Sequence, residues 1–145
     1  MSREPRPPRQ AHSVEELTSD DLVLSLGDLR PEQVAALVTL EHDNTQVVLT
    51  GERRRHYLTE HPDAARHENK LTELVLHPDE AHRNRKDPLT AIFYQRLDEG
   101  HYLRVAIVLQ PNAGELKHSV FSFRLAKERE VEKGRAAGRV VWRRK

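Results

Sequence analysis

The sequence predicts an α+β fold in which N-terminal helices pack on an antiparallel sheet of three to four strands. The prediction rests on a change of period near Ala91, because the apolar residues before it recur mainly at helical spacing. After it, three runs alternate apolar and polar residues as half-buried strands do: 91–97, 101–110 and 117–125. Turn residues at 98–100 and 111–114 link these runs, so we expect an antiparallel meander. Helices first and strands afterwards is the order typical of an α+β protein.

The N-terminal third is expected to lie outside this domain. Residues 1–12 carry three prolines and three arginines without apolar periodicity, which predicts a disordered arm. Residues 13–46 form an acidic amphipathic segment, with eight acidic residues against one arginine. In this segment Pro31 suits the start of a helix, since the first helical turn does not use the N–H that proline lacks. Val34, Leu37 and Val38 then give the helix an apolar stripe, which we expect to dock on the domain or on a partner.

Residues 47–125 are expected to form the folded domain. A short strand at Val47-Val48-Leu49 leads to Thr50, a suitable N-cap for a helix over 52–60. His61-Pro62 ends that helix, because the residue before a proline disfavours the α region. A second helix is expected from 62 to 76, followed by another short helical turn at 79–81.

Residues 126–145 are predicted to form a charged helix that ends at Gly138, and then a basic C-terminal strand or tail. From 127 to 145 eight bases stand against three acids, whereas the formal net charge of the whole chain is only +1. An acidic front and a basic back indicate either interaction surfaces of opposite sign or solvated ends in a charge-rich protein.

The composition excludes several classes of protein. The chain has no cysteine, which excludes disulfides and thiolate metal sites and predicts a cytoplasmic location. No run approaches the roughly 20 apolar residues that a membrane span requires, and no apolar stretch follows the N-terminal arginines as in a secretory signal. The nine histidines include no pair at i, i+4 with an intervening glutamate, so the sequence predicts no metal and no cofactor.

Strand alternation predicts one polar face on the sheet. Arg104 shares a face of its strand with Tyr102 and Ala106, while His118, Ser122 and Arg124 share a face of the next. If the register permits, these four polar residues lie on one surface. The alternative is an ordinary amphipathic sheet with a solvated side.

The stretch Leu49-Thr50-Gly51-Glu52-Arg53-Arg54-Arg55-His56-Tyr57-Leu58-Thr59-Glu60-His61-Pro62 resembles the opening helix of the phage-type barnase/EndoU/colicin/RelE-like nucleases. The similarity continues through Leu76-His77-Pro78-Asp79, the strand with Phe93-Tyr94, and Tyr102-Leu103-Arg104-Val105-Ala106-Ile107-Val108. Ser122 matches the hydroxyl residue of the family's closing strand. The resemblance implies an RNA-directed, metal-independent nuclease that cleaves by transesterification, often acting as a toxin or carried by phage and mobile elements.

This resemblance gives each candidate residue a role. It implies His56 as the acid or base, since the unperturbed pKa of histidine lies near working pH. Arg104 is the implied phosphate clamp and Ser122 orients the phosphate or the 2′-hydroxyl, with His118 in support. The expected RNA contacts are made by basic side chains that a solvated charge run would also explain: Arg53, Arg54, Arg55, Arg85, Lys86, Lys117 and Arg124.

The alternative function is a catalytically silent phage-encoded module that grips RNA or a host protein. Residues 13–43 suit this function, because an acidic amphipathic helix docks on a basic surface of a host or immunity protein, or covers the protein's own RNA site.

Overall fold

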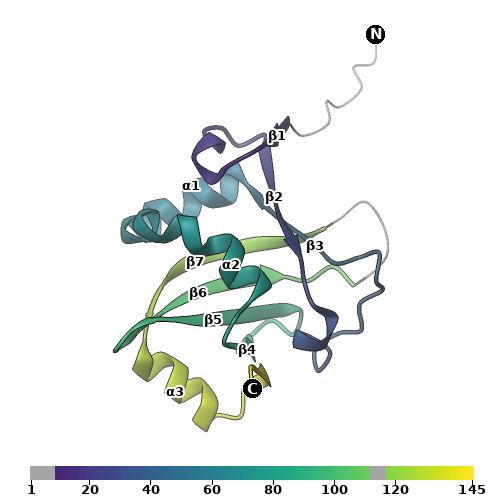
Figure 1. The fold of residues 1–145 in the computed structure, drawn as a ribbon, viewed down its shortest axis with the longest axis vertical. Coiled ribbons are helices and arrows are strands. Elements are labelled where there is room, and N and C mark those ends of the chain that lie inside the picture. The colour runs from purple at the N-terminus through teal and green to yellow at the C-terminus, as the bar shows by residue number, and fades with distance from the viewer. Residues whose placement is uncertain (1–8, 112–116) are drawn as a thin grey trace.

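A computed structural model describes residues 9–111 and 117–145. These residues form one eight-stranded mixed sheet in the order β1-β2-β3-β7-β6-β5-β4-β8 (Figure 1). The predicted fold class is therefore wrong: the sheet has twice the expected strands, and its β1–β2 and β3–β7 pairs are parallel. The strands are β1 (Arg9–Ala11), β2 (Leu22–Asp28), β3 (Gln46–Thr50), β4 (Glu80–Arg83), β5 (Thr90–Asp98), β6 (His101–Val108), β7 (His118–Lys127) and β8 (Val140–Arg143).

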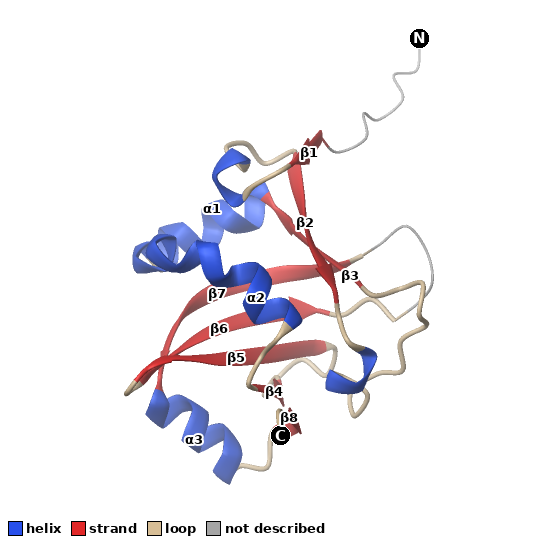
Figure 2. Ribbon diagram, in the orientation of Figure 1, coloured by secondary structure: helices blue, strands red, loops and turns tan. Residues whose placement is uncertain are grey.

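Helices cover both faces of this sheet, so they do not form the single N-terminal layer that was expected. On one face α1 and α2 pack with a 3₁₀ stretch between them, and α3 stands apart at the end of β7 (Figure 2). On the other face Val131 of α3 packs among Tyr94, Tyr102 and Ala106. The helices are α1 (Gly51–Glu60), α2 (Leu71–Leu76) and α3 (Glu128–Ala136), and the 3₁₀ helices are Val14–Glu16, Pro31–Gln33 and Pro62–Lys70.

The central meander is confirmed. Strands β5, β6 and β7 pair antiparallel, and the register places Phe93 opposite Val105 and Val105 opposite Phe123. These side chains are fully buried under α1 and α2, where the ring of Tyr57 meets that of Phe123 edge-on at 5.7 Å between centroids. Because side chains alternate along a strand, the neighbouring residues of β6 and β7 point to the α3 face.

Residues 13–46 belong to the core rather than to an appendage. Strand β2 pairs with β3 inside the sheet, and its Leu24 and Leu26 are buried in the main apolar cluster with Leu29 and Val34. Pro31 opens only a 3₁₀ turn, so the predicted amphipathic helix is wrong. Of the arm predicted as disordered, residues 1–8 lie outside the described residues, and 9–11 form β1.

Two more predictions need correction. The second helix is a 3₁₀ stretch over Pro62–Lys70 followed by α2, instead of one α-helix over 62–76. The turn expected at 79–81 is replaced by β4, which pairs with β5 on one side and with β8 on the other. The C-terminal strand therefore forms the edge beside β4. Among the described residues, no helix has both the length and the apolar character that crossing a membrane requires.

The sheet has a narrow seam between β3 and β7. Their parallel pairing consists of Val47 with His118 and Val48 with Ser119, whereas β6 and β7 pair along most of their lengths. The seam joins the three N-terminal strands to the five that carry the α3 face.

Candidate functional site

The α3 face holds a cavity of about 310 Å³ that we call the cationic pocket. Among the described residues that line it, six carry a positive charge and one, Glu130, carries a negative charge. Strands β4 to β7 supply its floor and α3 supplies one wall, so the pocket depends on the tertiary fold. The six basic residues are Arg83, Arg85, Arg104, Arg124, Lys133 and Arg139.

Two arginines at the floor of the pocket share one carboxylate. Arg104 and Arg124 are directly opposite each other on β6 and β7, a register that like charges disfavour. Glu130 of α3 reaches between them: its Oε1 is 2.9 Å from Nη2 of Arg124, and its Oε2 is 3.5 Å from Nε of Arg104. The hydroxyl of Tyr94 donates a hydrogen bond of 2.8 Å to Oε2. An anionic group is thus already held where the two guanidinium groups converge.

Arg104 is the least satisfied member of this group. Its side chain is 16% exposed, and its Nε is buried without a hydrogen bond to any residue that the structure describes. Burial, followed by the neighbouring charge of Arg124, lowers the pKa of Arg104 from its ordinary value. Burial and the Glu130 carboxylate raise the pKa of Tyr94 to about 12, so this phenol stays protonated and can donate to an anion at neutral pH.

A buried histidine also lines the pocket. His82 of β4 has its Nε2 2.6 Å from Oε1 of Glu80, which lies on the same face two residues earlier. Burial acts to raise the pKa of Glu80, but hydrogen bonds from Arg135 and His82 outweigh it and hold that pKa below its ordinary value. Burial lowers the pKa of His82 in spite of the Glu80 bond, so the imidazole is neutral near pH 7. Because an ionised Glu80 only accepts hydrogen bonds, Nε2 carries the ring proton and donates it to Glu80, and Nδ1 is the basic nitrogen.

Gly134 lets α3 lie close to this histidine. A Cβ at position 134 would stand 2.5 Å from Nδ1 of His82, closer than side chains approach each other. The glycine therefore sets the depth at which α3, and with it Glu130, lies over the sheet.

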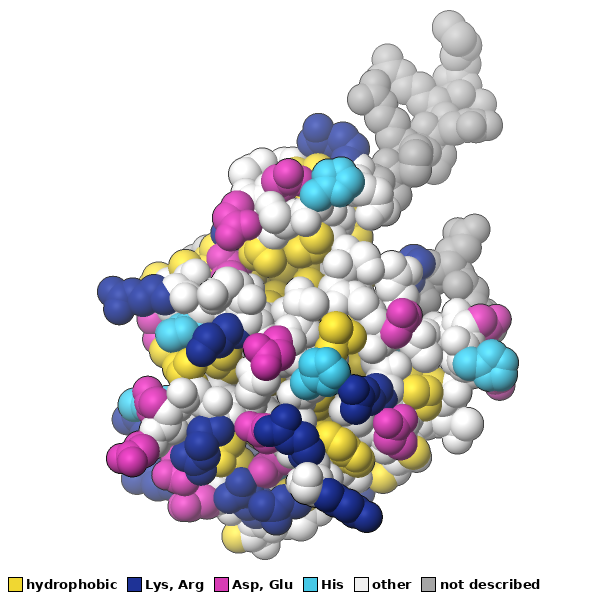
Figure 3. Space-filling model, in the orientation of Figure 1, with side chains coloured by type: hydrophobic (Ala, Val, Ile, Leu, Met, Phe, Trp, Pro, Cys, Tyr) yellow, Lys and Arg dark blue, Asp and Glu magenta, His cyan; other side chains and the backbone are white. Residues whose placement is uncertain are grey.

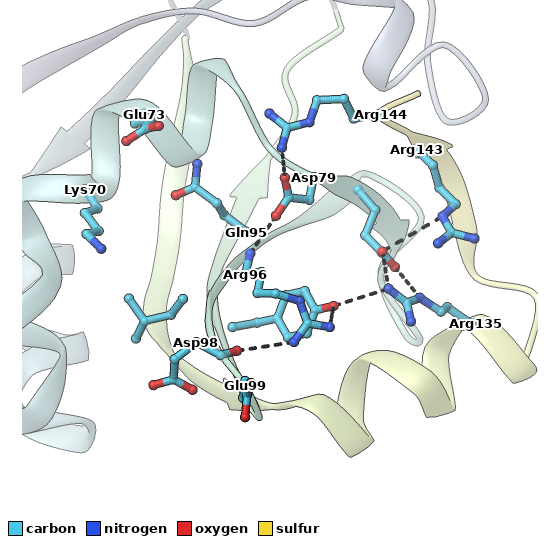
Figure 4. Close-up of a pocket in the computed structure, with 13 residues that line it drawn as sticks. Lys70, Glu73, Asp79, Gln95, Arg96, Asp98, Glu99, Arg135, Arg143 and Arg144 are labelled. Atoms are coloured by element: carbon cyan, nitrogen blue, oxygen red, sulfur yellow. Dashed lines mark hydrogen bonds and ion pairs between the residues drawn. The ribbon is translucent and has the colours of Figure 1, made fainter.

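A larger cavity of about 880 Å³ lies beside β5, β4 and β8, and we call it the paired pocket. Figure 3 shows Lys and Arg interspersed with Asp and Glu over the lower part of the face in view. The charges cancel because Arg135 pairs with Glu80 at 2.7 Å and Arg144 pairs with Asp79 at 2.5 Å. Figure 4 shows Arg144 and Asp79 pointing toward each other, with Arg135 nearby beside α3. The basic side chains of the paired pocket are largely committed to the protein's own carboxylates.

The structure separates two of the residues that the resemblance combined. Arg104 and Ser122 do share the α3 face, as strand alternation predicts, because Ala106 is opposite Ser122 in the register. His56 lies on α1, which packs on the opposite face, and its Nε2 is 4.0 Å from Glu52 on the same helix. The sheet stands between His56 and Arg104, so they do not form one site.

His118 is a structural residue in this fold. It is fully buried, its Nδ1 accepts a hydrogen bond from the backbone N–H of Gln110, and its Nε2 is 2.8 Å from the carbonyl oxygen of Asn44. Both ring nitrogens are therefore occupied at the β3–β7 seam. The neighbouring Lys117 is hydrogen-bonded to the side chain of Gln46.

The three arginines of α1 are also engaged within the protein. Arg53 donates two hydrogen bonds to the carbonyl oxygen of Phe121 and stacks over its ring at 4.0 Å. Arg54 forms a two-pronged ion pair with the buried Glu68. Arg55 pairs with Asp20 in the N-terminal segment. These contacts attach α1 to its surroundings and leave little of the triplet for a ligand.

Two of the expected RNA contacts, Arg85 and Arg124, do line the cationic pocket, while Lys86 lies in the exposed turn beyond Arg85. From the sequence, Arg85, Arg104 and Arg124 were proposed among the residues that line the pocket. The other lining residues were missed, among them His82, Tyr94 and Glu130. Alternation in β5 places Tyr94 on the Arg104 face, but β4 is too short to show a period of its own.

Across residues 9–111 and 117–145, no group of three or more His, Cys, Asp or Glu side chains is placed to hold a metal ion. The chain matches no protein-family model, and comparison with curated proteins and with solved structures gives no significant match.

Proposed function

We propose that this protein binds RNA by seating one of its phosphate groups in the cationic pocket. The observation that carries the proposal is the convergence of Arg104, Arg124 and the Tyr94 hydroxyl on one carboxylate, which marks a place built for an anion. Guanidinium groups donate to phosphate oxygens as they do to carboxylate oxygens. The basic rim adds the long-range attraction on which nucleic-acid binding depends. An RNA ligand also agrees with the cytoplasmic location that the cysteine-free sequence predicts.

The test is a binding titration of the full chain with end-labelled single-stranded RNA in the presence of EDTA. Arg124→Gln and Arg104→Gln are each expected to weaken binding about tenfold or more, because a hydrogen bond to a charged group contributes about 1.5–3 kcal/mol. Each should also reduce the slope of log affinity against log salt by about 0.7 for each phosphate that the variant no longer neutralises.

The matched control is Arg66→Gln. Arg66 is an exposed arginine in the 3₁₀ stretch of the opposite face, so its variant removes the same charge without touching the cationic pocket. We expect its affinity to stay close to that of the parent. An equal decrease in affinity for all three variants would mean that RNA binds through net charge alone and would contradict the proposal.

Metal-independent RNA cleavage by transesterification is the second candidate function, with His82 in place of His56 as the proton-transfer group. It is favoured by one observation: His82 lines the same pocket as Arg104 and is neutral near pH 7. Gly134 lies against Nδ1, so α3 must move away before this neutral imidazole can take the 2′-hydroxyl proton while the arginines stabilise the phosphorane. Cleavage that persists in EDTA, stops on a 2′-deoxy substrate and is lost in His82→Gln would support it; RNA left intact would leave a binding module.

A further inference from the structure

The Glu130 carboxylate occupies the place in the cationic pocket where a bound phosphate would meet Arg104 and Arg124. It occupies the floor of the pocket through Arg124 at 2.9 Å, the Tyr94 hydroxyl at 2.8 Å and the more distant Arg104 at 3.5 Å. An anion that uses the two arginines must first displace this carboxylate. The free energy of binding is therefore the interaction of the ligand with the two arginines minus the interaction of Glu130 that is lost.

An internal phosphodiester gains little from this exchange. It carries one negative charge and two unesterified oxygens, the same as the carboxylate that it replaces. The displaced Glu130 also stays on α3 beside the pocket, where its charge opposes the ligand. The backbone of an uninterrupted RNA chain thus exchanges one monoanion for another.

A phosphate monoester gains more. At pH 7 it carries about 1.5 to 2 negative charges and offers three terminal oxygens. The third oxygen can reach Nε of Arg104, which has no hydrogen-bond partner among the residues described. The additional charge faces the basic rim, where Arg83, Arg85, Lys133 and Arg139 outnumber the one carboxylate.

The volume of the pocket agrees with such a ligand. At about 310 Å³ it is at the small end of ligand pockets, which suits one nucleotide rather than a length of polymer. Ile92 and Tyr94 add an apolar part to the floor of the pocket beside the two arginines.

We propose that the cationic pocket recognises a terminal phosphate monoester of RNA, which takes the place of the Glu130 carboxylate between Arg104 and Arg124. This proposal rests on the proposed function, since it names the part of the RNA that the same site binds. It makes Glu130 a specificity-determining residue, because its carboxylate is the competitor that a singly charged phosphate does not displace.

The first experiment compares one single-stranded RNA sequence in three forms, each labelled away from the end that is varied. The forms carry hydroxyls at both ends, a 5′-phosphate, or a 3′-phosphate. We expect one of the phosphorylated forms to have a dissociation constant at least tenfold lower than the form with two hydroxyls. Whether this is the 5′-phosphate or the 3′-phosphate form identifies the end of the RNA that the pocket binds. Equal binding of the three forms would overturn this inference and leave the proposed function standing. RNA that does not bind in any form would overturn both.

The second experiment uses Glu130→Gln on the full chain, with Glu132→Gln as its control. Both substitutions remove one negative charge from α3, but Glu132 is exposed and does not line the pocket. We expect Glu130→Gln to bind the end-phosphorylated RNA at least tenfold more tightly than Glu132→Gln does. Equal affinities would show that the phosphate is bound away from Arg104 and Arg124, and would overturn the inference even if the protein prefers phosphorylated ends. A single cooperative urea transition for each variant confirms that both are folded, and the midpoint of Glu130→Gln is expected to be the lower one because Arg104 and Arg124 lose their carboxylate.

Discussion

The two pockets of this protein use charge in opposite ways. The paired pocket is nearly three times larger, yet its arginines are committed to Glu80, Asp79 and Glu128. The cationic pocket is smaller and holds an excess of positive charge, and Nε of Arg104 has no hydrogen-bond partner among the described residues. Charged groups can thus stabilise the fold or remain available to a ligand, and the size of a cavity does not tell which.

The largest expected effect is on the paired pocket. Glu80→Gln should lower the free energy of unfolding by about 3 kcal/mol, since removing one member of a buried ion pair leaves an uncompensated charge and typically costs about 3–5 kcal/mol. Urea denaturation at pH 7 measures the change. Glu99→Gln, an exposed residue of the same pocket, should stay within about 0.5 kcal/mol of the parent. A decrease below about 1 kcal/mol for Glu80→Gln would contradict the statement that the charges of the paired pocket stabilise the fold.

The next effect comes from the wall of the cationic pocket. Gly134→Ala brings a methyl group against His82 and should lower the free energy of unfolding by about 1–3 kcal/mol, the usual cost of overpacking. This cost should outweigh the better helix propensity of alanine, worth about 1 kcal/mol. Repeating the substitution in His82→Ala should make it neutral or stabilising by urea denaturation. If the destabilisation persisted there, the close approach of α3 to His82 would not be its cause.

A third prediction contrasts one arginine from each pocket. Arg104→Met should leave the free energy of unfolding unchanged or raise it by about 1 kcal/mol, because a desolvated guanidinium is replaced by an apolar group of similar length. Its RNA affinity should fall nonetheless. Arg135→Met should instead lower the free energy of unfolding by at least about 1 kcal/mol, since Glu80 loses its two-pronged partner. Equal denaturation curves for the two variants would contradict the idea that only one pocket serves stability.

The smallest effect is on the pH dependence of stability. Burial lowers the pKa of His82 from 6.5, and the charges of Arg135 and Arg139 also disfavour its protonation. Above pH 6.5 the ring is neutral in the folded and the unfolded states, so its burial does not reduce the free energy of unfolding. As the pH falls below 6.5, His82 is protonated in the unfolded chain before it is protonated in the folded protein. The free energy of unfolding therefore decreases. Urea midpoints at about pH 7.5 and about pH 5.5 should show this decrease, reduced in His82→Gln and retained in His56→Gln. The contribution of Glu80 belongs to lower pH, below its ordinary value of 4.5.

The sequence predicted those elements whose structure depends on the residues within them, such as strands with alternating apolar and polar residues. Alternation located β5, β6 and β7 to within a few residues, and Thr50 accepts the expected N-cap hydrogen bond from Arg53. Strands β2 and β4 were missed because pairing outside the segment makes each of them a strand: β2 pairs with β3, and β4 lies between β5 and the distant β8. Tertiary pairing decides the state of such short segments.

For the same reason, the sequence predicted which strand residues share the face of the candidate site, but not which helix covers them. Parity along β6 and β7 places Arg104, Ser122 and Arg124 on one face, and this needs no knowledge of other strands. Which layer covers that face is a question of topology. The resemblance put α1 and His56 over it, whereas α3 and Glu130 lie there.

The narrow seam between β3 and β7 has a consequence for biosynthesis. Strands β2 and β3 leave the ribosome early and can form a hairpin together, but the strand that receives them is β7, near the end of the chain. Synthesis proceeds at about 5–20 residues per second, so the free edge of β3 waits several seconds for its neighbour. During that time the unpaired backbone groups along this edge are open to chaperones and to other nascent chains. Pairing with β7, which also places His118 between Asn44 and Gln110, closes this edge.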